Sequence, residues 1–476
     1  MKFTDGIIVV VKKDCPTCLL IAPVLEELEQ SGKEVSVYYQ DTSDFLSVTN
    51  VIDDRELEVS YRLNIEIVPT LLMFSGGKES SRLTGWEREE WRSCLELESL
   101  GEDLPDWRPG CGSRSVEPEI IDVLEAKFGN FDFSARKIPL PLLADDIEYC
   151  FENGWTDGLP VVPPTQERVL RMLKGTSRAP NEVLGVLPPY SIQCTVSKVA
   201  INAVLAGCKP EYFPVVLAAV EAALEPAFCL HGLLATTWFS GPMAIVNGPI
   251  RSEINMNWSG NVLGQGSRAN STIGRALQLT VRNVGGGEPQ KTDQSTFGSP
   301  VKYGFCFAED ESTSWTTLSE ERGLDRGVSA VTLFSADGPI GCVDQKSREP
   351  EGLIYSLVGT LKGINHIDMA NGSDAVVIIG PEHGRVFDNA GWSKERTVDA
   401  LQSALLIRGE NLGMGTDPEV ASKEHSSQSE KIAKFREGGL TLVRAGGQAG
   451  LFSAIIPGWI MKGAPGTDPV TKEIKL

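Results

Sequence analysis

Residues 6–18, GIIVVVKKDCPTC, decide the fold of the amino-terminal part of the chain. Residues 6–11 form an apolar, β-branched run that is typical of a buried strand. Two cysteines separated by two residues follow it, and from Cys15 to Glu29 the apolar residues recur at helical spacing. The sequence therefore predicts a strand that leads into a helix, with Cys15 and Cys18 at the junction.

Apolar runs and amphipathic segments continue to alternate up to residue 97. The spacing predicts three further strands and two further helices, in the order Val35–Tyr39 (strand), Arg55–Leu63 (helix), Ile67–Phe74 (strand), Ser80–Thr84 (strand) and Glu87–Leu97 (helix). This order indicates a small α/β domain over residues 1–100.

The position of Cys15 suggests redox chemistry. A thiol at the first turn of a helix lies close to unpaired backbone N–H groups and the positive end of the helix dipole, which stabilise its thiolate. We therefore expect Cys15 to be the more acidic and more exposed thiol of the pair, and the nucleophile. Cys18, one turn later, can attack a mixed disulfide formed by Cys15, which makes it the resolving thiol. A zinc half-site is the alternative, but residues 1–110 contain no second Cys-x-x-Cys and no histidine pair.

With Cys15-Pro16-Thr17-Cys18 at the junction and Val68-Pro69-Thr70 opening the third strand, residues 1–95 resemble the thioredoxin/glutaredoxin superfamily. The resemblance implies that Pro69 is a cis-proline beside the two cysteines. It also implies that the backbone of Val68 is available to pair with a bound substrate chain. The one redox group expected is a Cys15–Cys18 disulfide, without a further cofactor, and the partner expected is a thiol reductant.

A change of composition marks the end of this domain. Gly101–Pro118 combines three prolines and three glycines without a helical or strand period, which predicts a linker over residues 101–142. Within it, residues 109–113 (PGCGS) are similar to the Sec/Cys-Gly-Ser-Cys motif of an uncharacterised bacterial selenoprotein group, although Arg114 stands where the last cysteine would be. Cys111 would then lie on a mobile tether able to move between domains.

Residues 143–476 match no characterised family by their motifs. Helices are expected at Thr195–Ala206 and Pro214–Ala223, and buried strands at Ala244–Val246 and Val376–Ile379. Helices that alternate with short apolar strands and glycine-rich turns predict a second, larger α/β domain.

Two glycine-rich loops in this domain are candidate anion sites. Gly260, Gly264 and Gly266 precede a helical run, and Arg268 and Arg275 could contact a carboxylate or phosphate. The loop is neither a Walker A motif nor a Rossmann fingerprint. Close packing of a helix on the backbone is the alternative.

A similar arrangement recurs at residues 444–452, RAGGQAGLF. Gly446 and Gly447 form a turn between a short strand and a helix expected over Leu451–Ile456. Two such loops in one domain favour an anionic small molecule as substrate.

Several thiols and imidazoles of the large domain are candidate catalytic groups. Cys194 precedes a helix, as Cys15 does, and is the first candidate for a second reactive thiol, with Cys111 and Cys306 next. His231 and His383 follow apolar runs and are acid/base candidates at strand ends, with satisfied structural histidines as the alternative.

Two further groupings have a second interpretation each. Cys229 and His231 would share one face of a strand, as a metal or Cys/His pair, but no further ligands stand at recognisable spacing, so no metal is assigned. The acidic run Glu309-Asp310-Glu311 could bind a cation or an amine, or be a solvated strand end.

Composition excludes some classes of partner. The 476 residues are 41% hydrophobic and 23% charged, and their net charge of −20, more than half of it in residues 1–110, repels nucleic acid. No apolar stretch reaches the roughly 18 residues of a membrane span, and residues 1–13 lack the charge order of a secretory signal. We therefore expect a cytoplasmic protein, with mostly reduced cysteines and no membrane or nucleic-acid partner. The oligomeric state stays open.

Three functions fit these observations. The first is a two-domain thiol-dependent oxidoreductase, in which the Cys-x-x-Cys domain recycles a thiol or thiol-linked intermediate of the α/β catalytic domain. The second is a non-redox lyase or hydrolase with a protective thioredoxin-like domain. The third is a partner-binding module built on the thioredoxin fold. Dependence of turnover on a dithiol separates the first two.

Overall fold

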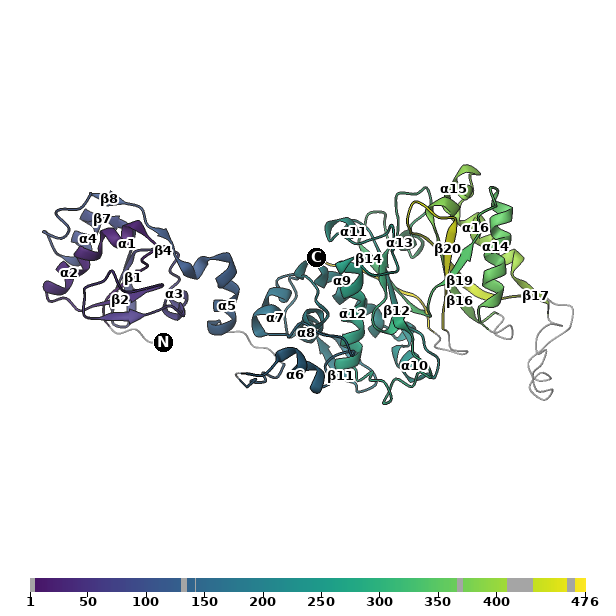
Figure 1. The fold of residues 1–476 in the computed structure, drawn as a ribbon, viewed down its shortest axis with the longest axis horizontal. Coiled ribbons are helices and arrows are strands. Elements are labelled where there is room, and N and C mark those ends of the chain that lie inside the picture. The colour runs from purple at the N-terminus through teal and green to yellow at the C-terminus, as the bar shows by residue number, and fades with distance from the viewer. Residues whose placement is uncertain (1–4, 130–134, 142, 366–370, 409–430, 460–466) are drawn as a thin grey trace. The chain divides into compact units, whose positions relative to one another are not determined.

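The computed structural model describes residues 5–129, 135–141, 143–365, 371–408, 431–459 and 467–476 (Figure 1). The chain divides into two units, residues 1–132 and 133–476. Each unit has hydrophobic cores of its own and is described by itself.

Unit 1 is built on a mixed five-stranded sheet in the order β3-β2-β1-β5-β6. Its central strand β1 is parallel to β2 and antiparallel to β5. The strands are β1 (Gly6–Val11), β2 (Val35–Tyr39), β3 (Val51–Asp53), β5 (Thr70–Ser75) and β6 (Lys78–Thr84). Because Val9, Val10 and Val11 are fully buried, β1 is the apolar run that the sequence predicts for a strand covered on both faces.

The helix predicted over Cys15–Glu29 is divided into α1 (Pro16–Leu20) and α2 (Ala22–Gln30). Pro23 has no N–H to donate within a continuous helix, so the chain breaks at Ile21, which ends α1 and begins α2. The other helices of this sheet are α3 (Glu58–Arg62) and α4 (Arg88–Leu95).

Residues 107–128, predicted as part of a linker, belong to the fold of unit 1. They form β8 (Trp107–Arg108), β9 (Cys111–Gly112), η1 (Arg114–Val116) and α5 (Pro118–Phe128). β8 pairs with β7 (Trp86–Glu87), and β9 pairs with β4 (Ile67–Val68). The glycines of the predicted linker permit close packing: a Cβ on Gly101 would lie 2.7 Å from the Trp86 ring. Composition alone did not distinguish this use of glycine from flexibility.

Unit 2 contains two four-stranded sheets, in the orders β13-β12-β14-β21 and β15-β20-β16-β19. In each sheet one pair is parallel, β12 with β13 and β16 with β19, and the remaining pairs are antiparallel. The strands are β12 (Gly241–Asn247), β13 (Cys306–Ala308), β14 (Ala330–Ala336), β15 (Ile340–Val343), β16 (Ser373–Ile379), β19 (Phe435–Arg444), β20 (Phe452–Pro457) and β21 (Val470–Glu473).

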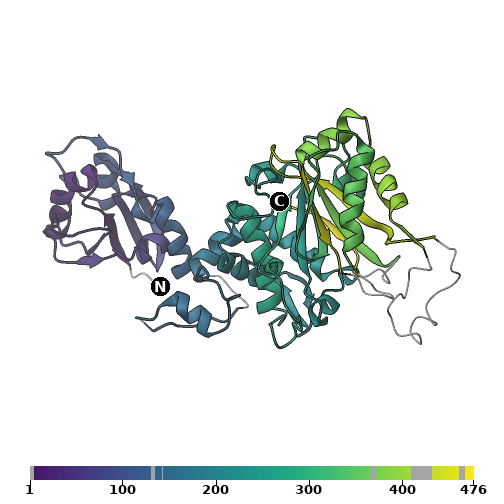
Figure 2. The same cartoon turned by 45° about the vertical axis from the view of Figure 1, so that its right-hand side comes forward.

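The two sheets pack face to face between two layers of helices. Met243 and Ile245 of β12 share a core with Val376 and Ile378 of β16, so this core lies between the sheets. The intervening strand residues point outward into two other cores. One is shared with α8 (Val196–Ala206), α9 (Phe213–Leu224) and α12 (Arg268–Asn283), the other with α14 (Pro350–Gly363) and α16 (Lys394–Ala404). Figures 1 and 2 show this helix–sheet–sheet–helix order.

Shorter elements complete unit 2. They are α6 (Asp146–Glu152), α7 (Gln166–Leu173), β10 (Val183–Leu187), β11 (Ile192–Thr195), η2 (Pro210–Tyr212), η3 (Pro226–Phe228), α10 (Leu230–Ala235), α11 (Ile250–Glu253), η4 (Pro300–Lys302), α13 (Leu318–Glu321), α15 (Pro381–Asn389), β17 (Leu406–Arg408) and β18 (Lys431–Ala433).

Two predicted elements of unit 2 differ from the structure. The helix expected over Leu451–Ile456 is instead β20, which pairs with β15 and β16. Short apolar runs fit a buried strand and a helix equally well, and here sheet pairing decides. Cys229 and His231 do not share a strand, because the chain forms α10 at this point.

No single helix in the described ranges is long and apolar enough to cross a membrane. One pair of helical segments, Pro210–Leu224 and Pro226–Ala235, passes such a test together by length and composition, with a bend of 73° between them.

Candidate active site around Cys15

Cys15 lies at the junction of the central strand and the first helix of unit 1. It is the N-cap residue of α1, in an extended conformation with φ −148°. Its Sγ accepts a hydrogen bond from the backbone N–H of Cys18 at 3.3 Å. The same sulfur lies 3.4 Å from the carbonyl oxygen of Val68, which accepts a hydrogen bond when the thiol is protonated. The sequence placed Cys15 correctly at this junction.

Cys18 lies one turn further along α1 and is fully buried. Its Sγ accepts a hydrogen bond from the backbone N–H of Lys12 at 3.5 Å. The two cysteines approach to 3.1 Å and are free thiols, so a short movement would bring them to the roughly 2.05 Å of a disulfide bond.

The two thiols differ in acidity. The hydrogen bond from the Cys18 thiol, assisted by the Cys111 thiol and by the backbone N–H groups of Cys18 and Thr17, lowers the pKa of Cys15 to about 5 against the opposing effect of burial. Burial, followed by the hydrogen bond to Cys15, raises the pKa of Cys18 far above its usual value. The predicted order of acidity agrees with the structure, but a neighbouring thiol, not the helix terminus, is its largest cause.

The predicted exposure of Cys15 is wrong. Its exposed fraction is 1% and that of Cys18 is 0%, so neither thiol of the pair is open to solvent. Cys111, by contrast, is partly exposed. Cys111, whose thiol interacts with that of Cys15, belongs to the segment of residues 107–113, which we call the resident segment.

The resident segment pairs with the backbone of Val68. β4 and β9 form an antiparallel pair in which Val68 faces Cys111 and Ile67 faces Gly112. The Val68–Pro69 peptide bond is cis, as expected, and the Pro69 carbonyl accepts a hydrogen bond from the N–H of Gly85 at 2.8 Å. The expectation that the Val68 backbone is free for an incoming chain is therefore corrected, because the chain's own Cys111 already pairs with it.

Side-chain and backbone hydrogen bonds hold the resident segment in place. The Thr17 hydroxyl donates to the Pro109 carbonyl at 2.6 Å, and the N–H of Ser113 donates to the Glu66 carbonyl at 2.8 Å. The buried Gln40 donates from Nε2 to the Ser113 hydroxyl at 2.7 Å. Cys111 is thus not on a mobile tether.

Sequence reasoning found the motif around Cys111 but not its place beside Cys15. The glycines on both sides of Cys111 were the available signal. The pairing of β4 with β9 joins positions more than 40 residues apart, and no local pattern encodes it.

In unit 2 the predicted anion-binding arginines are used inside the protein. Arg275 forms a bidentate ion pair with Asp157, at 2.8 and 2.7 Å, and also donates to the carbonyls of Leu159 and Pro160. Arg268 donates from Nε to the carbonyl of Gly207 at 3.0 Å. Arg275 therefore ties the loop before α7 to α12, whereas the sequence predicted that it binds an anion.

The structure brings the two glycine-rich loops together. A Cβ on Gly447 would lie 3.3 Å from the Cα of Gly260, and the N–H of Gly446 donates to the Trp258 carbonyl at 3.0 Å. The N–H of Gly264 donates to the Asn261 carbonyl at 2.9 Å, while Gly266 has a φ of +117° in the turn before α12. Two of the predicted cradle donors thus satisfy backbone carbonyls, which supports close packing of the loops.

The candidate thiols of unit 2 are buried. Cys194 ends up in β11, and the N-cap of α8 is Thr195. Burial raises the pKa of Cys194 to about 12, in spite of nearby Lys198. Burial also raises the pKa of Cys306 and Cys208. The expected likeness between Cys194 and Cys15 is therefore corrected: one residue's shift in helix start removes the thiol from the cap position.

The two candidate histidines lie in different surroundings. His383, in α15, is 1% exposed; its Nδ1 lies 2.8 Å from the Ser453 hydroxyl and its Nε2 lies 3.1 Å from the Asp344 carbonyl. Both ring nitrogens have hydrogen-bond partners within the protein, so His383 fits the alternative of a satisfied structural histidine. His231 is exposed on α10 and does not lie at a strand end.

The acidic run after β13 is part of a buried polar network. Glu309 accepts hydrogen bonds from Asn247 at 2.6 Å and from the N–H of Leu318 at 2.8 Å, and Lys394 lies 4.0 Å away. Burial raises the pKa of Glu309. The amine that this carboxylate faces is therefore a lysine of its own chain.

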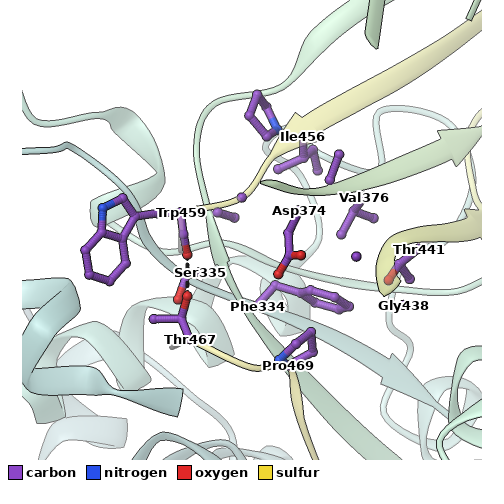
Figure 3. Close-up of a pocket in the computed structure, with 15 residues that line it drawn as sticks. Phe334, Ser335, Asp374, Val376, Gly438, Thr441, Ile456, Trp459, Thr467 and Pro469 are labelled. Carbon is purple, nitrogen blue, oxygen red and sulfur yellow. Dashed lines mark hydrogen bonds between the residues drawn. The ribbon is translucent and has the colours of Figure 1, made fainter. Parts of the chain in front are cut away.

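One hollow in unit 2 lies apart from all of these residues (Figure 3). It is an open hollow of about 350 Å³, a volume that includes solvent at its mouth. It lies beside the start of β16 and the middle of β19, away from the end at which the glycine-rich loops meet. The carboxylate of Asp374 points into this region in Figure 3 and is paired with Arg436 at 2.5 Å. None of the catalytic or binding residues predicted from the sequence lines it.

Within the part of the chain that the structure describes, no group of three or more His, Cys, Asp or Glu side chains is arranged to hold a metal ion. No model of a known protein family matches the chain, and a search of curated proteins finds no match either.

Proposed function

We propose that the chain is a thiol–disulfide oxidoreductase whose unit 1 has a thioredoxin-like fold and reacts through Cys15 and Cys18. The sheet order β2-β1-β5-β6, the cysteine pair after β1 and the proline that precedes β5 support this assignment. The fold assignment rests on topology together with these motifs.

The observation that carries the proposal is the asymmetry of the two thiols. At neutral pH a thiol with a pKa of about 5 is a thiolate, whereas Cys18 keeps its proton. The Cys15 thiolate attacks one sulfur of a substrate disulfide and expels the other as a thiolate. Cys18 then loses its proton and attacks Cys15, which forms the Cys15–Cys18 disulfide and releases the second thiolate. One substrate disulfide thus becomes two thiols while one dithiol is oxidised.

For unit 2 we propose a reaction that oxidises a thiol or a thiol-linked substrate. The dithiol of unit 1 then reduces this oxidised group. Covalent linkage raises the effective concentration of the dithiol to about the millimolar range for an acceptor on the same chain. Because Cys194 is buried and its pKa is raised, it is a poor candidate for the group that unit 1 reduces. A thiol-linked substrate of unit 2 is the better candidate. Turnover that continues without a dithiol would instead favour the lyase or hydrolase function.

Oxidation of the reduced full-length chain by glutathione disulfide tests the proposal. We expect a Cys15–Cys18 disulfide and two equivalents of released glutathione, measured by peptide mapping and thiol titration. Cys15→Ser should abolish this disulfide. Cys94→Ser is the matched control, because Cys94 lies in the same unit with its thiol 3.4 Å from the Ser81 hydroxyl. If the wild-type chain forms no Cys15–Cys18 disulfide at any ratio of oxidised to reduced glutathione, the proposed function is wrong.

A further inference from the structure

The resident segment places a third cysteine at the Cys15–Cys18 pair. Cys111 faces Val68 across an antiparallel pair, and the Val68 carbonyl lies 3.4 Å from the Cys15 sulfur. The Cys111 thiol also donates a hydrogen bond that stabilises the Cys15 thiolate. Three sulfur atoms thus meet at one point of unit 1.

Gly110 and Gly85 allow the resident segment to lie close to Val68. A Cβ on Gly110 would lie 2.3 Å from Cγ2 of Ile67 and 2.8 Å from the Val68 carbonyl oxygen. A Cβ on Gly85, whose φ is +74°, would lie 2.8 Å from the Gly110 nitrogen. Side chains at these positions would push the resident segment away from Val68. The local sequence is therefore built for close approach of Cys111 to Cys15.

Access to the site distinguishes the three thiols. Cys15 and Cys18 are buried, with exposed fractions of 1% and 0%, whereas Cys111 is partly exposed. A disulfide from solution therefore meets Cys111 first. A polypeptide substrate cannot pair with Val68 while the resident segment is in place, which favours small disulfides.

We propose that Cys111 is a third redox-active cysteine, the resident disulfide partner of Cys15, through which small external disulfides exchange with the Cys15–Cys18 pair. The inference rests on the proposed function and deepens it, because it names the substrate class and a further reacting residue.

The steps balance as three thiol–disulfide exchanges. Burial raises the pKa of Cys111, so the Cys111 thiol first loses its proton to solvent. The resulting thiolate attacks an external disulfide RSSR, so that a Cys111–SR bond forms and RS⁻ leaves. The Cys15 thiolate then attacks the Cys111 sulfur, forming a Cys15–Cys111 disulfide and expelling the second RS⁻. Finally Cys18 loses its proton and attacks Cys15, which forms the Cys15–Cys18 disulfide and releases the Cys111 thiolate, and Cys111 takes up a proton again. The Cys15–Cys18 pair loses two electrons and the Cys18 proton, and with one further proton from solvent RSSR becomes two RSH.

Replacement of the last nucleophile tests the proposal, with glutathione disulfide as the probe. In the full-length Cys18→Ser chain we expect a disulfide that links the Cys15 peptide to the Cys111 peptide, found by acid quenching, alkylation and mapping without reduction. This crosslink should be lost in Cys18→Ser/Cys111→Ser and retained in Cys18→Ser/Cys94→Ser. A Cys15–glutathione adduct with Cys111 free, or no oxidation of Cys15, would overturn the proposal.

A time course of oxidation by glutathione disulfide, in chains that keep Cys18, gives a second, independent measurement. In the wild-type chain a Cys111–glutathione adduct should appear before the Cys15–Cys18 disulfide, and Cys111→Ser should lose this fast route. Equal rates in the two chains would overturn the role of Cys111 and leave the proposed function intact. Failure of the wild-type chain to form the Cys15–Cys18 disulfide would instead refute the proposed function.

Discussion

Val68 and Cys111 face each other across the antiparallel pair of β4 and β9, directly before Pro69 and beside the Cys15 sulfur. The chain thus supplies its own strand at the position where the resemblance implies an incoming substrate. Because this strand carries Cys111, it adds a third thiol to the site.

The first prediction concerns the Cys15 thiolate. In the reduced chain, absorbance near 240 nm should show a thiolate that forms with a midpoint near pH 5. Cys18→Ala should move this midpoint upward, since the Cys18 thiol makes the largest contribution to the lowered pKa, and Cys111→Ala should move it upward by less. Cys94→Ala should leave it in place. A wild-type midpoint near the ordinary value of about 8.5 would contradict the assigned network.

The second prediction is that the resident segment limits the access of reagents to Cys15. Gly110→Ala should increase the rate of Cys15 alkylation by iodoacetamide about tenfold or more, because overpacking costs about 1–3 kcal/mol and 1.4 kcal/mol is tenfold in an opening equilibrium. Gly112→Ala is the matched control, since a Cβ there would meet no atom within 4 Å. Mass spectrometry of the Cys15 peptide gives both rates. Equal alkylation in the two variants would show that the resident segment does not control access.

Local sequence predicted the parts of the fold that local patterns encode. The strand at residues 6–11, the cysteine pair at its end and the helix over most of residues 195–206 follow from apolar spacing and turn residues. Long-range pairing decided the rest: β20 became a strand because β15 and β16 flank it. The place of Cys111 depends on the same kind of pairing.

The sequence also did not reveal which side chains are buried or which ion pairs they form, and this limited the prediction of the site. The sequence identified Arg275 as a charged residue beside glycines, but its partner Asp157 lies 118 positions away. For Cys194 a helix start was predicted correctly to within one residue, but the thiol is buried, and burial raises its pKa instead of lowering it.

The third prediction follows from the burial of Cys194. In the folded chain at pH 8, Cys194 should resist alkylation, because its exposed fraction is 0% and burial raises its pKa to about 12. Cys229, which is partly exposed in the same unit, is the internal reference and should react first. Both should react fully after denaturation. Fast labelling of Cys194 in the native chain would restore it as a second reactive thiol.

The last prediction separates a structural Arg275 from an anion-binding one. Arg275 and Asp157 form a bidentate pair whose side chains are only 16% and 11% exposed. Removing one member of such a pair leaves a buried charge without compensation, so Arg275→Gln should destabilise unit 2 by on the order of 3 kcal/mol. Arg385→Gln, which breaks a 3.5 Å pair with Glu382 on the surface of the same unit, should cost less than about 1 kcal/mol. Urea unfolding followed by tryptophan fluorescence measures both. Arg275→Gln with an unchanged unfolding transition but weaker binding of inorganic phosphate would instead support the anion site expected from the sequence.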